Sequence, residues 1–253
     1  MSTSHEATCL SPFPGLLSFG AAVSWLCLLT TTGCGGFAAQ GKNADGVRLF
    51  SQARYQDAIQ EFDQAINNDP RDPDGYYNLA ATYHRMGTVN GNPNDLKQAE
   101  QYYRMCQDRD PDHVQSYRGL AVLMVQEGRS EEAFRLIENW ADRQPALAEP
   151  KIELARLYQE FGDLDAAKAH LNEAIHADPR NARALAALGN LREQMGETAA
   201  ALKDYEQSLS HDRFQADVAA RASALRAALL PAQSPTTATG EMQIATGVGP
   251  QIR

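Results

Sequence analysis

A period of 34 residues constrains the fold of this chain more than any other feature of its sequence. The stretch AINNDPRD, residues 65–72, returns 109 positions later as AIHADPRN, residues 174–181. The interval equals three periods of 34 residues with seven residues left over, which predicts further copies between the two. Proline stops one helix and starts the next, because it lacks the N–H that continuation requires. The period is marked by Pro70, Pro111, Pro145 and Pro179, followed by Arg213.

The same apolar pattern precedes each of these five positions. Twelve residues before them stand Ala58, Ala99, Ala133, Ala167 and Ala201, and eight residues before them stand Phe62, Tyr103, Ile137, Leu171 and Tyr205. Residues four apart lie on one face of a helix. In the preceding helix of repeats two to five, a leucine comes before a small residue: Leu79–Ala80, Leu120–Ala121, Leu154–Ala155 and Leu188–Gly189. Small residues let two helices approach closely and large ones fill the gaps, so the pattern predicts an all-α chain of helix pairs.

This pattern resembles the tetratricopeptide repeat (TPR) family over about Ala39 to Arg213. The family signature reads most fully in the fourth repeat, as Leu154, Ala155, Tyr158, Gly162, Ala167, Leu171, Ala174 and Pro179. The resemblance implies a right-handed solenoid over residues 42–230, with about five helix–turn–helix repeats and a capping helix. The expected repeats are residues 39–72, 73–113, 114–147, 148–181 and 182–213, with the cap at 214–230.

The seven residues left over lie in the second repeat. Gly87 stands twelve residues before its alanine, whereas the matching glycines of later repeats stand five before theirs. We expect Asn92 to cap the following helix and Pro93 to take its first position. The extra residues are predicted to form a surface loop at 88–94, either a tolerated insertion or a contact for a partner.

The first 33 residues differ in kind from the repeats. No charged residue occurs between Glu6 and Lys42, and Leu16 to Leu29 is an apolar run of fourteen. Such a run is short for a membrane span of about twenty residues and is typical of a signal peptide. The following TTTGCGG resembles the bacterial lipoprotein processing box, which implies cleavage after residue 33 and acylation of Cys34.

Other interpretations of this N-terminal segment stay open. One is an uncleaved membrane anchor, another is ordinary cleavage near Ala38 or Ala39, and a third is a cytosolic protein. Residues 34–41, GGFAAQG after the cysteine, are predicted to be a flexible tether. The tail at 231–253 is rich in Pro, Thr, Gly and Ala, a composition that predicts disorder.

Two single residues carry predictions about packing. Cys106 stands where two sister repeats have Ala65 and Ala174, so we expect a small core residue with an unreactive thiol. Trp140 reverses the order of small and large residues found in sister repeats. We therefore expect its indole to be largely buried, against the next repeat.

The sequence predicts no enzyme, cofactor, metal site or small-molecule substrate. His170 and His176 are six residues apart and fall on different sides of a helix, unlike the i, i+4 pair of a zinc protease. The net charge of −9 argues against nucleic acid as a partner. Other proteins or peptides are the expected partners, together with a membrane reached through lipidated Cys34.

The resemblance also implies a concave groove lined by the first helix of each repeat. Matching the family's groove positions gives Tyr77, His84, Arg118, Val122, Ile152, Arg156, Arg183 and Asn190. Asn78 matches one position of the clamp that holds chaperone tails in some family members, but Asn43, Val47, Gln115 and Gly119 replace the others. The three groove arginines are expected to recognise acidic or C-terminal peptide segments, or else merely to solvate the groove.

The expected function is therefore an exported, lipid-anchored scaffold for protein–protein interaction at the bacterial cell envelope. Similar proteins of the family assemble pilus or secretion complexes or act as adaptors for cell-wall enzymes. In a Gram-negative cell, the absence of Asp after Cys34 would imply the outer membrane, facing the periplasm. The alternatives are a structural tether with an uncleaved anchor and, less favoured, a regulator or subunit of an envelope hydrolase.

Overall fold

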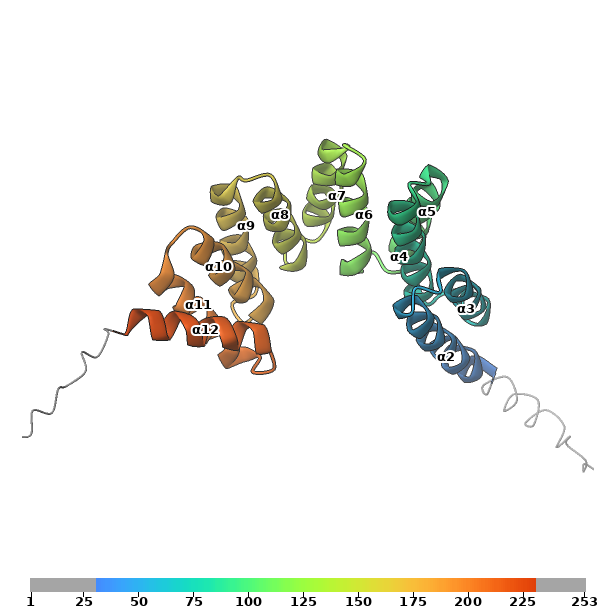
Figure 1. The fold of residues 1–253 in the computed structure, drawn as a ribbon, viewed down its shortest axis with the longest axis horizontal. Helices are drawn as coiled ribbons and strands as arrows, with labels where there is room; N and C mark the ends of the chain where they lie inside the picture. Colours follow the sequence, from blue (N-terminus) through green and yellow to red (C-terminus); the bar gives the residue numbers. More distant parts are fainter. Residues whose placement is uncertain (1–30, 231–253) are drawn as a thin grey trace, which may run out of the picture. The chain divides into compact units, whose positions relative to one another are not determined.

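The structure is a computed structural model that describes residues 31–230, with side chains from residue 36 onward. Its regular elements are α-helices joined by short turns, and no strand occurs between residues 31 and 230 (Figure 1). Residues 1–30 of the signal peptide predicted at 1–33, and the tail at 231–253, lie outside the described residues. The helices form two compact units, which meet in the sequence between Arg143 and Gln144, and each unit is described by itself.

The first unit contains three helix hairpins. The α2–α3, α4–α5 and α6–α7 pairs pack within hairpins, while α3–α4 and α5–α6 pack between them. The helices are α2 (Thr31–Ser51), α3 (Tyr55–Asn68), α4 (Pro73–Asn90), α5 (Pro93–Arg109), α6 (Val114–Gln126) and α7 (Ser130–Arg143). In Figure 1 they run from blue to green along the chain.

The second unit contains two hairpins and a final helix. The α8–α9 and α10–α11 pairs pack within hairpins, α10 also contacts α8 and α9, and α12 packs on α11. The helices are α8 (Glu149–Glu160), α9 (Leu164–Ala177), α10 (Ala182–Gln194), α11 (Thr198–His211) and α12 (Ala216–Leu229). The last of these covers Ala201 and Tyr205 through its buried Ala222.

The core consists of the residues that the repeat pattern marks as small and large. All five predicted alanines are fully buried, and the large residues four positions later are at most 3% exposed. The reason for the small positions is visible at Gly189. A Cβ there would lie 2.7 Å from Cδ1 of Tyr205, so the α10 backbone approaches this ring too closely for any larger residue. The predicted all-α repeat fold is confirmed.

The turns inside the hairpins depend on a left-handed backbone conformation. Gly128, Gly162 and Gly196 take it with φ of 76°, 82° and 79°, a region that glycine enters without steric cost. In the first repeat the same place is held by Ala53 at φ 59°, where a Cβ costs about 1–2 kcal/mol. This turn is therefore the one strained turn of its kind among the described hairpins.

The structure corrects the prediction that residues 34–41 form a flexible tether. Helix α2 begins at Thr31 and continues through this segment to Ser51. Three glycines lower the helix propensity here, but Ala39 is only 1% exposed. Packing of this alanine in the first hairpin outweighs intrinsic propensity, because most helical stability in proteins comes from tertiary contact.

No helix within residues 31–230 is long and apolar enough to cross a membrane.

The structure also corrects the surface loop predicted at 88–94. The extra residues lengthen two facing helices: α4 has 18 residues against 13 in α6, and α5 has 17 against 14 in α7. Each gains about one turn of 3.6 residues, and Gly91 makes the left-handed connection at φ 64°. A longer hairpin satisfies the added backbone groups within helices, which an irregular loop would leave to water.

The local details of this hairpin agree in part with the sequence. The side chain of Asn92 accepts a hydrogen bond from the backbone N–H of Asn94, and Pro93 takes the first turn, so the predicted cap is confirmed. Gly87 remains helical instead of forming the turn. A Cβ on Gly87 would lie 2.6 Å from Cδ2 of Leu96, so here glycine serves the close contact between α4 and α5.

Candidate functional site

The four groove residues predicted in the second unit line a single hollow between α8 and α10. Ile152 and Arg156 come from α8, and Arg183 and Asn190 come from α10. The hollow has a volume of about 240 Å³, and its remaining lining residues are Ala155, Gln159, Leu171 and Ala187. Apolar side chains thus form part of the wall, while two guanidinium groups and two amides supply its polar groups.

A buried carboxylate holds the two arginines of this hollow. Glu153 has no solvent exposure. Its Oε2 accepts a hydrogen bond of 3.1 Å from Nε of Arg156, and its Oε1 accepts one from Nη2 of Arg183. A buried carboxylate is costly unless it is paired and hydrogen-bonded. Because each of its oxygens takes one guanidinium, Glu153 is paired on both sides and fixes the positions of both cations.

The spacing of charges along α8 produces this arrangement. Glu153, Arg156 and Glu160 follow one another at three and four residues, which places them on one helix face. The second guanidinium is positioned by α10, because Asn181 caps this helix by accepting a 2.9 Å bond from Ala184 N, and Arg183 lies in its first turn. Sequence reasoning missed Glu153, although the spacing of glutamate and arginine in EPKIELARLYQE was a usable signal.

A chain of amides lies beside the arginines. Oδ1 of Asn190 accepts hydrogen bonds from Gln194 at 2.9 Å and from Gln159 at 3.5 Å. Gln159 also donates to Oε1 of Gln194 at 2.8 Å. Because the oxygen of Asn190 is already used twice, its NH₂ group is left as the donor that faces other partners.

The groove residues predicted in the first unit do not gather in the same way. His84 lines a hollow of about 280 Å³ with Phe50, Ala81, Arg85, Thr88, Tyr103 and Gln126. Its ring nitrogens lie 3.3 Å from Tyr103 Oη and 2.8 Å from Gln126 Oε1. Tyr77, Arg118 and Val122 are half-buried on α4 and α6 and do not line this hollow. Burial raises the pKa of Tyr77 above its ordinary value of 10.

Two of the places of the chaperone-tail clamp are occupied by asparagines that bond one another, Asn43 and Asn78. Asn43 is only 9% exposed and donates to Oδ2 of Asp72 at 3.2 Å. Its Oδ1 accepts a 3.3 Å bond from Asn78. Burial raises the pKa of Asp72. These three side chains tie α2 to the start of α4.

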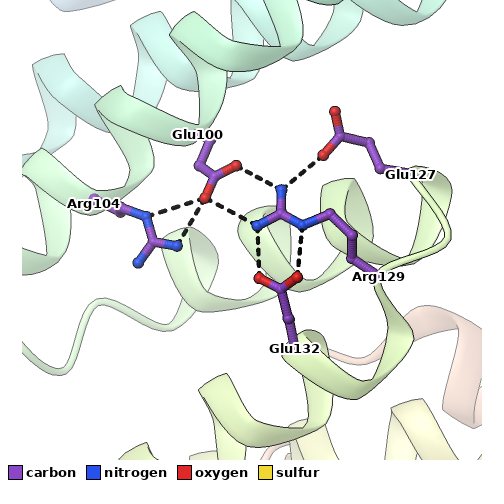
Figure 2. Close-up of polar contacts among 5 residues, drawn as sticks. All are labelled: Glu100, Arg104, Glu127, Arg129 and Glu132. Atoms are coloured by element: carbon purple, nitrogen blue, oxygen red, sulfur yellow. Dashed lines mark hydrogen bonds and ion pairs between the residues drawn. The ribbon is translucent and has the colours of Figure 1, made fainter.

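A second arginine–carboxylate cluster lies in the first unit and was not predicted (Figure 2). Nη1 of Arg129 lies 2.7 Å from Glu100 and 2.9 Å from Glu127, and its Nη2 lies 2.8 Å from Glu132. Arg104 adds a 2.7 Å contact to Glu100. Hydrogen bonding from Arg129 lowers the pKa of Glu100 against the opposing effect of burial. The cluster connects α5 to the turn between α6 and α7.

Two core predictions of the sequence have a clear outcome. Cys106 is fully buried, and burial raises the pKa of its thiol to about 12, so the predicted core role is confirmed. Trp140 is also fully buried, as predicted. Its indole stacks on Tyr117 with ring centroids 4.2 Å apart and donates to Asp112 at 3.0 Å. The predicted contact with the next repeat stays a prediction.

The described residues offer little for catalysis or metal binding. Between residues 31 and 230, no three His, Cys, Asp or Glu side chains come together in a way that would hold a metal ion. The hollow between α8 and α10 has no nucleophile among its lining residues. The polar groups of this hollow are suited to recognition through hydrogen-bond donors. Together with the fold, this surface defines a helical-repeat scaffold for protein–protein interaction.

Comparison with known proteins identifies the repeat. Families described as "TPR repeat" and "Tetratricopeptide repeat" match residues 46–87, 73–113, 125–191 and 182–213. The chain therefore carries tetratricopeptide repeats. A thermophilic TPR protein of Thermus thermophilus has the same fold, with a TM-score of 0.55 and 23% identity over 75% of this chain and 100% of the other.

Curated relatives share the repeats over part of their length. "Hsp70-Hsp90 organizing protein 2" of Arabidopsis thaliana is 35% identical over 72 residues, 28% of this chain and 11% of the relative. "DnaJ homolog subfamily C member 7 homolog" of Schizosaccharomyces pombe is 23% identical over 185 residues, 69% of this chain and 39% of the relative. The chain thus spans much less than two thirds of either protein.

Proposed function

We propose that the chain is an exported, lipid-anchored TPR scaffold that binds other proteins at a bacterial cell envelope. It would act there as an assembly factor for a pilus or secretion complex, or as an adaptor for a cell-wall enzyme. The observation that carries the binding role is the hollow between α8 and α10, where two arginines share the buried carboxylate of Glu153. Names such as that of the Arabidopsis organizing protein are consistent with a partner that is itself a protein.

The recognised feature of the partner is an acidic or C-terminal segment. Arginine presents planar, permanently charged donors that match a carboxylate in two-point geometry. Arg156 and Arg183 supply such donors on neighbouring first helices, with side chains 30% and 39% exposed. The rigid helices hold these donors in place before binding, which reduces the entropy lost on association.

The anchoring role rests on the sequence around Cys34. The apolar run at residues 16–29, followed by TTTGC, favours processing at this cysteine. A lipid on Cys34 would hold the first unit close to the membrane surface, because α2 includes this residue and continues to Ser51 without a break. A single acyl chain binds a membrane only marginally, so stable anchoring requires more than one chain or a second contact.

Replacement of Cys34 tests the anchor. Cys34→Ala should abolish incorporation of labelled fatty acid and leave the precursor unprocessed. Cys106→Ala is the matched control, since this thiol is buried and two sister repeats carry alanine there. Normal labelling and a normal mature N-terminus in Cys34→Ala would contradict lipidation. A wild-type chain that stays in membranes at precursor mass without label would indicate the uncleaved anchor instead.

Co-purification from membranes in mild detergent, with mass spectrometry, tests the scaffold. A partner should be retained by the full chain and by Arg180→Glu, an exposed position with no ion pair among the described residues. The same partner should be lost with Arg183→Glu. Equal retention by both variants would show that the hollow is not the binding surface.

A further inference from the structure

Arg156 is shared between two carboxylates that differ in burial. Its Nε contacts Glu153, which is completely buried, and its Nη1 contacts Glu160 at 3.1 Å. The side chain of Glu160 is 45% exposed and belongs to the last turn of α8. Glu160 does not line the hollow, whereas Arg156 does. One carboxylate therefore belongs to the core of the site, and the other lies on its solvent side.

We infer that the hollow is a receptor for one carboxylate group of a partner, and that Glu160 is an internal competitor for Arg156. The inference rests on the proposed function, since it assumes that a protein segment enters the hollow. The carboxylate comes from an acidic side chain or from a free C-terminus. Both sources present the same acceptor oxygens to the same donors.

The hydrogen-bond inventory of the site favours a ligand that only accepts. Both oxygens of Glu153 already accept from arginines, and Oδ1 of Asn190 accepts from two glutamines. The groups left over among the lining residues are Nη2 of Arg156, N–H donors of Arg183 and the NH₂ of Asn190. An ionised carboxylate is acceptor-only and binds such donors through short, charge-assisted bonds.

The charge balance explains why Glu160 would be exchanged. Arg156 and Arg183 carry two positive charges, and Glu153 with Glu160 carries two negative ones. The i, i+4 contact to Glu160 is exposed, and such pairs are weak because water competes for both partners. Release of Glu160 into water leaves the arginine pair with one uncompensated positive charge. A carboxylate in the hollow restores neutrality while Glu153 stays buried.

The hollow has room for this ligand. Its volume of about 240 Å³ corresponds to several water molecules at about 30 Å³ each. Ile152 and Leu171 are at most 5% exposed and contribute apolar surface to the wall. A methylene next to the carboxylate would contact this surface, which favours an acidic side chain or chain end over a free inorganic anion.

Fluorescence anisotropy with the full chain tests the inference. The first probe is a fluorescein-labelled decapeptide of alternating Gly and Glu with an amidated C-terminus. The second probe has Gln in place of Glu and a free C-terminal carboxylate. The third probe is this Gln peptide with an amidated C-terminus. The variants are Glu160→Gln and Arg183→Gln. Their matched charge controls are Asp165→Asn on α9 and Arg180→Gln, both exposed and without an ion pair among the described residues.

Glu160→Gln should tighten binding of a carboxylate probe several-fold, because the internal competitor is removed and no contact of the ligand is lost. Arg183→Gln should weaken it about tenfold, the loss expected for a charge-assisted bond. Both control variants should bind the carboxylate probes with an affinity within about twofold of that of the wild-type chain. Tighter binding of the first probe or of the second identifies the source of the carboxylate, and either result supports the inference.

Two results would overturn it. One is an equal affinity of Glu160→Gln and Asp165→Asn for the carboxylate probes, which would show that Glu160 does not compete for Arg156. The other is the carboxylate probes binding no better than the amidated neutral peptide. If the co-purified partner were still retained by the wild-type chain in that case, the scaffold function would stand and only the carboxylate receptor would fail. Glu160 is exposed, so its replacement leaves the fold intact and keeps the test interpretable.

Discussion

Two of the arginine–carboxylate clusters, one in each unit, are centred on opposite groups. In the first unit one guanidinium, that of Arg129, contacts three carboxylates (Figure 2). In the second unit one buried carboxylate, that of Glu153, contacts two guanidiniums. Arg129 donates from Nε, Nη1 and Nη2 to carboxylates of the protein. In the second unit Arg183 donates through Nη2 alone and Nη2 of Arg156 has no hydrogen-bond partner among the described residues, so donors remain for a ligand.

The positions of the clusters follow the same division. The Arg129 cluster connects the middle of α5 to the turn before α7 in the next repeat. The Glu153 cluster spans α8 and α10, the first helices of neighbouring repeats, and borders a hollow. We therefore propose a stabilising role for the first cluster and a binding role for the second.

The largest effect should come from apolar packing in the first unit. Its contribution to the free energy of unfolding is the value with which the ion pairs of this unit can be compared. Trp140→Ala should lower the free energy of unfolding by about 3–5 kcal/mol, because the indole is fully buried and stacked on Tyr117. Trp140→Phe, which keeps one aromatic ring but loses the bond to Asp112 and part of the indole volume, should cost less, about 1–2 kcal/mol. Urea unfolding followed by circular dichroism measures both. Equal losses would mean that the remaining aromatic ring contributes nothing to stability, which contradicts the role of stacking on Tyr117.

Double-mutant cycles compare the two clusters directly. The Glu153–Arg183 pair should show a coupling energy of about 1–3 kcal/mol, because Glu153 has no access to water. The Glu100–Arg129 pair, with side chains 21% and 30% exposed, should couple by about 0.2–1 kcal/mol after solvent screening. The variants are Glu153→Gln with Arg183→Gln, and Glu100→Gln with Arg129→Gln. A larger coupling in the first unit would reverse the comparison.

The first cluster should also make the stability of the folded protein depend on pH in the acidic range. Arg129 lowers the pKa of Glu100 below its ordinary value of 4.5. A lowered pKa in the folded state means that this stabilisation is fully present above pH 4.5 and is lost as the pH falls through the lower folded value. Arg129→Gln should flatten this part of the stability–pH curve. Thermal melts at several pH values check the change, and an unchanged slope would exclude the cluster as its source.

The strained turn of the first unit offers a gain in stability. Ala53 has φ 59°, where the second unit has Gly162 and Gly196. Ala53→Gly should raise the free energy of unfolding by about 0.5–1 kcal/mol, since relief of left-handed strain exceeds the entropy that glycine adds to the unfolded chain. Gly162→Ala is the converse and should destabilise the second unit. Destabilisation by Ala53→Gly would contradict the equivalence of these turns.

The smallest effect should come from deleting residues 88–94. The deletion joins Gly87 to Asp95 and Leu96, which reproduces the order of Gly162, Asp163 and Leu164 in the fourth repeat. We expect Gly87 to take the left-handed turn and Asp95 to cap α5 as Asp163 caps α9. Unfolding should remain cooperative with nearly unchanged stability per residue. Loss of cooperative unfolding would show that the longer hairpin is required by the first unit.

The core was predictable from the sequence because it depends on periodicity. Alanine and large residues at fixed positions identify both faces of each helix pair, as Ala167 and Leu171 illustrate. The helix at residues 34–41 was not predictable, since local glycine content favours a tether and only the burial of Ala39 decides otherwise. Nor was the length of the α4–α5 hairpin, because turn-forming residues at Gly91 and Asn92 do not reveal how far the flanking helices extend.

The candidate site was predictable in outline only. Family positions gave Ile152, Arg156, Arg183 and Asn190, which the structure brings to one hollow. They did not give Glu153, because charged residues are ordinarily placed on solvated faces. Its burial depends on two arginines from different helices meeting it at once, and a contact between α8 and α10 is not encoded in the periodicity of either helix.

Site-specific photocrosslinking in cell membranes tests the central claim most directly. A benzophenone side chain at Gln194, an exposed neighbour of Asn190 in the amide chain, should crosslink a protein partner, and Arg183→Gln should strongly reduce the yield of this product. The same group at Glu132, exposed beside the Arg129 cluster, should give none. A partner crosslinked from Glu132 and not from Gln194 would contradict the assignment of the binding role to the second unit.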